Sequence, residues 1–363
     1  MKDIRTVLPN PASDTAGAAS ALFSLGGLNV IHDAAGSMES YVTFDEAREL
    51  EDCRTVASRL SRLEAITGDD EILLDSLEQA CREEAPAFIA LIGSPVPFTI
   101  GMDLEGIAAE AEYRSGIPAF AVNSGGFALY DKGAGEALEK LLKKLAETPA
   151  EPRAGVINLL GATPLDYSPR ETEGLCVRLK EAGAKEVRTL TMARGAEEIR
   201  RAGEAERNVV ISLAGLPAAR WLKKRFGTPY TVEVPLDWQP GPDFSPKPEQ
   251  RVLVLGESVL TAQLVQLLQH RGVSAVAGVT AGYDPEVFPG LSVGRLDTEA
   301  AIRRELKQEY FALVGDPLYG LLLPPGSKTK LIARPHRALS ARLYPFREQP
   351  LEALMKEIER CFA

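Results

Sequence analysis

The chain repeats one pattern of hydrophobic and polar positions. An amphipathic segment with helical spacing ends at a glycine, a short apolar stretch follows, and a turn of small or polar residues comes next. Glycine suits the left-handed residue that follows a helix. Continuous apolar strands separated by helices indicate a parallel sheet that is covered on both faces. The pattern predicts strands over 117–122, 155–161, 184–190, 229–234, 251–256 and 273–279.

Two polar, proline-containing linkers interrupt this pattern, at 148–153 and at 237–250. A strand that looks buried opens directly after each linker, which is typical of a new domain. We therefore expect an α/β protein of three Rossmann-like parallel-sheet units around a central cleft. Their expected bounds are residues 1–150, 151–240 and 247–363.

The turns after the predicted strands carry the candidate ligand-binding side chains. In open parallel sheets, ligands bind beyond the carboxyl ends of the strands. Units that face one another would bring these turns to the central cleft. We also expect Ser258 to cap the helix that runs to His270. The candidates are Ser94 and Asn123 in the first unit, Ser212 in the second, and Glu257, Asp316 and His336 in the third.

Composition narrows the class of protein. At 363 residues with 45% hydrophobic and 25% charged side chains, the chain is typical of a soluble globular protein with more than one domain. The net charge of −10 argues against nucleic acid or an anionic membrane as the main partner. No apolar run has the roughly 18 residues of a membrane span, and residues 1–5 do not open a signal peptide. We expect a cytoplasmic location.

Other familiar chemistry is absent from the sequence. The four cysteines, Cys53, Cys81, Cys176 and Cys361, are far apart, so no Cys-x-x-Cys site exists. Cys81 and Cys176 have the spacing of core residues, whereas Cys53 lies in a polar run and stays a functional candidate. No Gly-x-Gly-x-x-Gly follows a strand, and three histidines are too few for a multi-histidine metal site.

The N-terminal segment carries the most specific motif. Residues 13–18 read Ser-Asp-Thr-Ala-Gly-Ala, and after an apolar stretch residues 32–37 read His-Asp-Ala-Ala-Gly-Ser. This resembles the nitrogenase component 1 family, whose motif is Cys-x-x-x-Gly-Ala followed by His-Gly-x-x-Gly-Cys. The family cysteines are matched here by Ser13, Ser37, and either Ser94 or Pro95. Asp33 stands where the family has a glycine.

The resemblance continues along nearly the whole chain. Weak matches occur in the family's order at 61–68, 92–103, 117–127, 158–161 and 205–210, and residues 226–230 read Phe-Gly-Thr-Pro-Tyr as in the family. The resemblance implies a nitrogenase component 1-like fold. It also implies a homodimer, or a heterodimer with a related subunit, and an electron-donor protein as a further partner.

The serines leave the chemistry of the motif open. In this family, three cysteines of a subunit hold its share of an iron–sulfur cluster at a subunit interface, and hydroxyl oxygen replaces thiolate poorly. Ser13 and Ser37 would cap the helices that follow them, a common use of serine. Alternatively, Ser13, His32, Asp33 and Ser37 would hold a hard metal through oxygen and imidazole.

Two functions remain as hypotheses. The resemblance implies an oxidoreductase subunit, without its own conventional cluster, that reduces a substrate in the cleft. The alternative is a non-catalytic binding or assembly protein for a metallocofactor, tetrapyrrole or corrinoid. A third hypothesis is a structural partner of a cluster-bearing paralogue. The cofactor implied by the family is an iron–sulfur cluster or a tetrapyrrole. We assign no catalytic residue and no metal ligand from the sequence.

Overall fold

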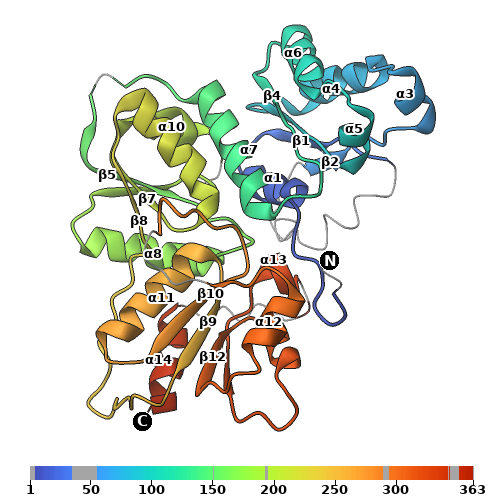
Figure 1. Cartoon of the computed structure of the whole chain (residues 1–363). Helices are drawn as coiled ribbons and strands as arrows, with labels where there is room; N and C mark the ends of the chain where they lie inside the picture. Colours follow the sequence, from blue (N-terminus) through green and yellow to red (C-terminus); the bar gives the residue numbers. More distant parts are fainter. Residues whose placement is uncertain are drawn as a thin grey trace.

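The computed structural model describes residues 5–34, 55–149, 151–192, 195–288, 294–341, 343 and 351–362. Within these ranges the chain forms three sheets, and each sheet is flanked by helices (Figure 1). Every strand pair recorded in the described residues is parallel. The predicted α/β class with parallel-sheet units is therefore confirmed.

The first sheet has the strand order β2-β1-β3-β4. Its strands β1, β3 and β4 are buried at every position, as expected for a sheet covered on both faces. The elements of this unit are α1 Asp14–Leu22, β1 Leu28–Ile31, β2 Thr55–Ala57, α3 Arg62–Thr67, α4 Glu71–Glu84, β3 Ile89–Ile92, α5 Pro95–Ile100, α6 Leu104–Ser115, β4 Ala119–Val122 and α7 Tyr130–Leu145.

The second sheet has the order β6-β5-β7-β8, so the chain crosses from one side of β5 to the other. The elements of this unit are β5 Arg153–Leu160, α8 Pro169–Glu181, β6 Glu186–Thr189, α9 Glu197–Arg200, η2 Arg201–Glu204, β7 Ala205–Val210, η3 Leu213–Gly215, α10 Leu216–Phe226 and β8 Tyr230–Val232.

The third sheet has five strands in the order β11-β10-β9-β12-β13. The elements of this unit are β9 Val252–Gly256, α11 Ser258–His270, β10 Ala275–Val279, β11 Gly294–Arg295, α12 Glu299–Glu305, β12 Ala312–Gly315, η4 Pro317–Leu322, β13 Lys330–Ala333, α13 Arg337–Ser340 and α14 Leu351–Phe362.

Glycines end helices where the sequence pattern predicts it. Gly116 follows α6 with φ 69° and Gly227 follows α10 with φ 78°, both in the left-handed region. In each case the glycine N–H donates to a carbonyl of the last helical turn. These caps direct the chain from the helix into β4 and β8.

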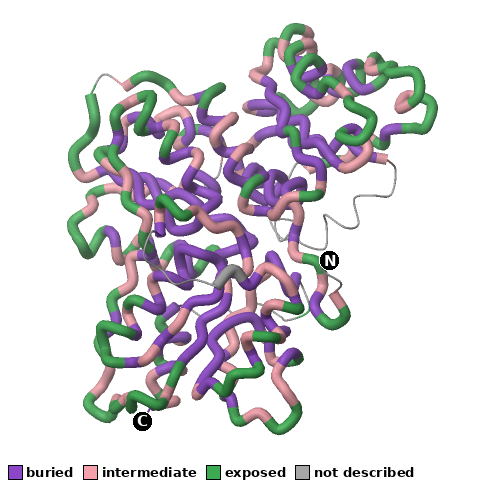
Figure 2. Tube along the Cα trace, in the orientation of Figure 1, coloured by how far each residue is buried: buried purple, intermediate pink, exposed green. Residues whose placement is uncertain are grey.

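The three units share one continuous core, drawn as buried trace in Figure 2. The largest cluster of buried apolar residues includes Ile92 of β3, Leu160 of β5 and Val254 of β9. Among the helices that the structure describes, none is long and apolar enough to cross a membrane.

Helices α1 and α7 cross at backbone contact, and this crossing positions the first residue of α7. A Cβ atom on Gly17 would lie 1.9 Å from the carbonyl oxygen of Tyr130, and one on Gly133 would lie 1.9 Å from that of Asp14. Only glycine leaves room for this approach. Tyr130, at the start of α7, is thereby held at the junction of the units.

Candidate functional site

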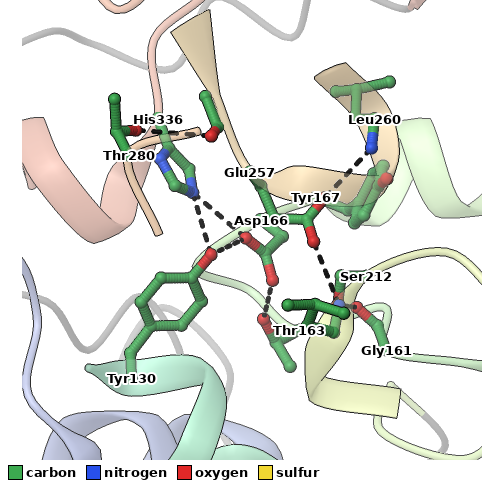
Figure 3. Close-up of polar contacts among 12 residues, drawn as sticks. Tyr130, Gly161, Thr163, Asp166, Tyr167, Ser212, Glu257, Leu260, Thr280 and His336 are labelled. Carbon is green, nitrogen blue, oxygen red and sulfur yellow. Dashed lines mark hydrogen bonds and ion pairs between the residues drawn. The ribbon is translucent and has the colours of Figure 1, made fainter. Parts of the chain in front are cut away.

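A polar cluster joins the three units at the strand ends (Figure 3). The Asp166 side chain, which follows β5, lies at its centre. The Oδ1 atom of Asp166 lies 3.0 Å from Nε2 of His336, which follows β13, and accepts a hydrogen bond from the hydroxyl of Tyr130. Thr163 donates to the other oxygen of Asp166 at 3.0 Å. One carboxylate thus contacts side chains from all three units.

Burial keeps the Tyr130 hydroxyl of this cluster protonated. Tyr130 is 1% exposed and Asp166 is 6% exposed. Burial and the nearby charge of Asp166 raise the pKa of Tyr130 well above its usual value. The phenol therefore stays protonated at neutral pH and donates to Asp166. His336 Nε2 lies 3.3 Å from the same hydroxyl, so the tyrosine, carboxylate and imidazole form one network.

Glu257 joins the second and third units. Its Oε1 atom accepts from the N–H of Leu213 in η3 at 3.0 Å, and its Oε2 atom accepts from Val259 and Leu260 in the first turn of α11 at 2.9 and 3.0 Å. Burial, together with the charge of Asp166, raises the pKa of Glu257 to about 8. The carboxyl group therefore takes up protons near neutral pH.

Glu257, and not Ser258, is the N-terminal cap of α11, so the predicted cap is wrong by one residue. The Ser258 hydroxyl donates instead to the carbonyl of Gly282, in the segment after β10. The Glu257 side chain is long enough to accept from the first turn of its own helix and also from Leu213. That second contact is a tertiary one and could not be predicted from local spacing.

Two other predicted candidates, Asp316 and Ser212, hold the backbone near the cluster through hydrogen bonds. Asp316 accepts from the N–H groups of Leu318 at 2.9 Å and of His336 at 2.7 Å, so it holds the backbone of the histidine. Burial raises the pKa of Asp316. The Ser212 hydroxyl donates to the carbonyl of Gly161 at 2.7 Å and joins the ends of β5 and β7.

A cavity opens beside the cluster, between the second and third units, with about 410 Å³ of empty space that includes open solvent. The guanidinium of Arg334 lies over the ring of Tyr167, 5.9 Å from its centroid, and the Arg334 Nε atom is buried without a hydrogen-bond partner. The cavity therefore offers one imidazole, one guanidinium and buried carboxyl groups beside an apolar wall. The lining side chains include Asp166, Glu257, Arg334 and His336 on the polar side and Val254, Leu255, Leu260, Leu264 and Val314 on the apolar side.

The other predicted candidates lie in the first unit. Ser13 caps α1 by accepting from the N–H of Ala16 at 3.4 Å, as the capping hypothesis predicts. The Ser94 hydroxyl donates to the carbonyl of His32 at 2.8 Å. Asp33 accepts from the N–H of Ala34 at 2.7 Å.

Asn123 is exposed at the end of β4, where its side chain donates to Glu105 at 3.2 Å. None of the hydrogen bonds recorded for Asn123 joins it to the central cluster. Ser37 and Cys53 lie outside the described residues.

The described residues at the family's cluster positions do not fit a conventional iron–sulfur cluster. Ser13 and Ser94 are both used in hydrogen bonds to the backbone. Cys81, Cys176 and Cys361 lie in helices, where burial raises the pKa of each thiol and that of Cys176 to about 11. Over the described ranges, no group of three or more His, Cys, Asp or Glu side chains is arranged to hold a metal ion.

Sequence reasoning missed the centre of the cluster. Tyr130 begins a helix whose apolar face is typical of ordinary core, and Asp166 lies beyond the turn that directly follows the predicted strand 155–161. Arg334 belongs to the turn after β13, but no signal distinguished its side chain from a solvent-exposed one. The burial of Tyr130 and Asp166 depends on contacts between units.

The fold defines a class of three-unit α/β protein, with a cavity where strand ends of the second and third units meet. Residues 14–244 match the model of the nitrogenase component 1 type oxidoreductase family, and the chain belongs to this family. It is 27% identical over 174 residues to the nitrogenase iron-molybdenum cofactor biosynthesis protein NifE of Clostridium pasteurianum. That match covers 47% of this chain and 37% of the relative, so it spans little more than a third of the relative's length.

Two solved structures are similar over the full chain. The structure titled nitrogenase Cp1 at pH 6.5 aligns with a TM-score of 0.75 and 13% identity, covering 100% of this chain and 94% of that one. Nitrogenase Cp1 at pH 5 aligns with a TM-score of 0.67 and 14% identity, covering 100% and 90%. At this identity the likeness shows the fold alone, and it confirms the predicted nitrogenase component 1-like architecture.

Proposed function

We propose that this chain binds a metallocofactor in the central cleft and serves in the assembly or delivery of that cofactor. The observation that carries the proposal is the position of His336 on the wall of a partly apolar cavity, with Asp166 at 3.0 Å from its Nε2 atom. Imidazole is a common metal ligand, and a carboxylate partner orients its ring.

Two side chains of the cavity suit a metallocofactor. His336 would provide an imidazole nitrogen to a metal. One guanidinium nitrogen of Arg334 lies 3.5 Å from Glu171 and donates to the carbonyl of Asp166 at 3.3 Å, so Arg334 would offer its buried, unpartnered Nε–H to an acceptor group of the cofactor. The bound cofactor would supply the metal centre itself. Asp166 and Asp316 would hold the His336 side chain and backbone in place, because they contact its Nε2 atom and its N–H group.

The serines of the first unit support binding over electron transfer. Electron entry in this family needs cluster thiolates, and the Ser13 and Ser94 hydroxyls are used here to cap α1 and to hold the carbonyl of His32. The similarity to NifE agrees with this proposal, because that relative is named for cofactor biosynthesis.

A second candidate is an oxidoreductase subunit, and the family membership favours it. In that case a related subunit in a heterodimer would contribute the cluster ligands. A homodimer would suit the binding function. Both functions use the same cleft, so they differ in redox chemistry and in partner.

The test uses protein that is expressed and purified without oxygen, as wild type, His336→Asn and His270→Asn. His270 is exposed at the end of α11 and serves as the matched control. We expect bound metal, measured as iron, cobalt and sulfide content with a visible spectrum, to fall in His336→Asn only. The visible spectrum would also distinguish a tetrapyrrole or corrinoid from an iron–sulfur cofactor. Equal metal content in both variants would contradict the proposal that the metallocofactor binds in the cleft.

A further inference from the structure

A second pocket lies in the first unit, lined by residues of α3 and α4 and of the segments that follow β1 and β2. It has about 300 Å³ of empty space, open solvent included, and shares no lining residue with the central cavity. Its function is therefore independent of the proposal made for the central cleft. The residues that line it are His32, Ser58, Leu60, Glu64, Asp69, Asp70, Ile72, Leu73 and Ser76.

His32 is a buried wall residue of this pocket with unused hydrogen-bonding capacity. Its side chain is 2% exposed, and its Nδ1 atom lies 2.8 Å from the hydroxyl of Ser58. Its Nε2 atom is buried and has no hydrogen-bond partner. A buried polar atom without a partner costs free energy, so it points to a group that is supplied from outside the chain.

Three carboxylates make the pocket negative. No ion pair is recorded for Glu64, Asp69 or Asp70 within the described residues. Glu64 caps α3 from the N3 position, and Asp69 accepts from the N–H of Glu71 at 3.2 Å. Asp70 precedes α4 but makes no side-chain hydrogen bond to it. The cap of α4 therefore does not explain the Asp70 carboxylate.

The charges around the pocket determine which kind of ligand can form a hydrogen bond with Nε2 of His32. Burial lowers the pKa of His32, so the ring is neutral at pH 7. We assign the tautomer in which Nδ1–H donates to the Ser58 hydroxyl at 2.8 Å, and in this tautomer the Nε2 atom is an acceptor. A ligand that donates to it must also tolerate the negative surroundings, which exclude an anion. The described residues hold no group arranged to ligate a metal ion directly, which favours an organic donor.

We infer that this pocket binds a primary ammonium group, with one N–H donated to Nε2 of His32 and the charge facing Asp70 and Glu64. The ammonium satisfies the buried acceptor and neutralises part of the carboxylate charge in one contact. The apolar side chains of Ile72 and Leu73 in the same wall suit a short alkyl chain.

The test is nuclear magnetic resonance of the full chain labelled with ¹⁵N-histidine, since the sequence has only three histidines. His270→Asn and His336→Asn assign the ring resonances, and n-propylammonium chloride is the probe. We expect a saturable shift of the His32 Nε2 resonance and none for the other two rings. Tetramethylammonium, which has the same charge and no N–H, should leave the His32 ring unchanged.

Variants separate the site from general charge effects. Asp70→Asn should lower the affinity for propylammonium roughly three- to fivefold, as expected for the loss of one solvent-accessible charge interaction. Glu83→Gln removes an exposed carboxylate from the same helix and should leave the affinity unchanged. Ser76→Lys places an ammonium group in the pocket wall. It should shift the His32 resonance without probe and should block binding of propylammonium. This variant also tests the site if Asp70→Asn does not fold.

The proposal is overturned if the His32 resonance does not saturate with the probe, or if tetramethylammonium shifts it equally. Unchanged affinity in Asp70→Asn would also overturn it. So would broadening of the His32 ring by Mn²⁺ at concentrations below those at which propylammonium acts, because that result would assign the pocket to a metal ion.

Discussion

The Nε2 atom of His336 lies 3.0 Å from Oδ1 of Asp166, although the two residues are 170 positions apart. The contact joins the strand ends of the second and third units. Tyr130 donates to the same oxygen from the start of α7 in the first unit. A single buried carboxylate therefore contacts side chains from all three units, and it also lines the cavity beside them.

Removing the Tyr130 hydroxyl should weaken the junction. Tyr130→Phe keeps the ring and deletes the donor to Asp166, leaving a buried carboxylate with fewer partners. We expect the free energy of unfolding in urea to fall by roughly 1–3 kcal/mol. Tyr113→Phe, on a ring that is 85% exposed, is the control and should cost almost nothing. Equal losses in both variants would contradict a structural role for the Tyr130–Asp166 contact.

The crossing of α1 and α7 should not tolerate a side chain. In Gly133→Ala the new Cβ atom would lie 1.9 Å from the carbonyl oxygen of Asp14, so the helices must separate. We expect a loss of about 3 kcal/mol or more in the free energy of unfolding, at the upper end of overpacking costs.

Gly174→Ala provides the matched control for Gly133→Ala. It lies within α8 with no atom within 4 Å of the added Cβ, so it should stabilise the chain by about 0.5–1 kcal/mol. Thermal unfolding of both variants checks the pair. A Gly133→Ala protein as stable as wild type would show that the two helices can separate without cost.

The pH dependence of stability should report the buried carboxyl of Glu257. Burial and Asp166 raise its folded pKa from the usual 4.5 to about 8. The folded chain therefore binds more protons than the unfolded chain between these values, and this contribution to stability falls as pH rises through the window. Each pKa unit corresponds to about 1.36 kcal/mol.

Glu257→Gln removes this titration. We expect the difference in unfolding free energy between wild type and variant to shift in favour of the variant from pH 5 to pH 8. Urea unfolding at several pH values measures it. A difference that stays constant over this range would show that Glu257 titrates normally.

Glu299 should show the opposite sign. Burial opposes its ionisation, but the N–H groups of Leu8 and Val7, the Thr6 hydroxyl and Arg303 hold the pKa of Glu299 well below its usual value. Its contribution to stability is therefore present above the usual carboxyl pKa and is lost as pH falls. These hydrogen bonds hold residues 6–8 of the N-terminal segment against α12.

Glu299→Gln should release that segment. We expect faster tryptic cleavage after Arg5 at pH 8, monitored by mass spectrometry. Glutamine keeps one acceptor oxygen but loses the negative charge and the second oxygen, so it holds the N–H groups of residues 6–8 more weakly. Glu309→Gln, on an exposed side chain of the same region, should leave the rate unchanged. Identical rates in both variants would mean that other contacts hold the segment.

Local chemistry made the fold class and many elements predictable. The strand predicted over 251–256 is β9, Val252–Gly256, and the strand predicted over 273–279 contains β10, Ala275–Val279. Such strands are read from apolar runs, and the caps at Ser13 and Gly116 involve only neighbouring residues. The family motif was also readable, because its residues lie close together in the sequence.

The candidate site was predictable only in part. Glu257 and His336 were expected because strand ends gather at one edge of a parallel sheet. Tyr130 and Asp166 were not, since their burial and their contact arise only when the units pack together. The sequence by itself therefore determined the elements, their order and the family. Only the tertiary structure decided which polar groups share a buried junction, because pKa, hydrogen bonding and cavity shape depend on residues that are distant in the chain.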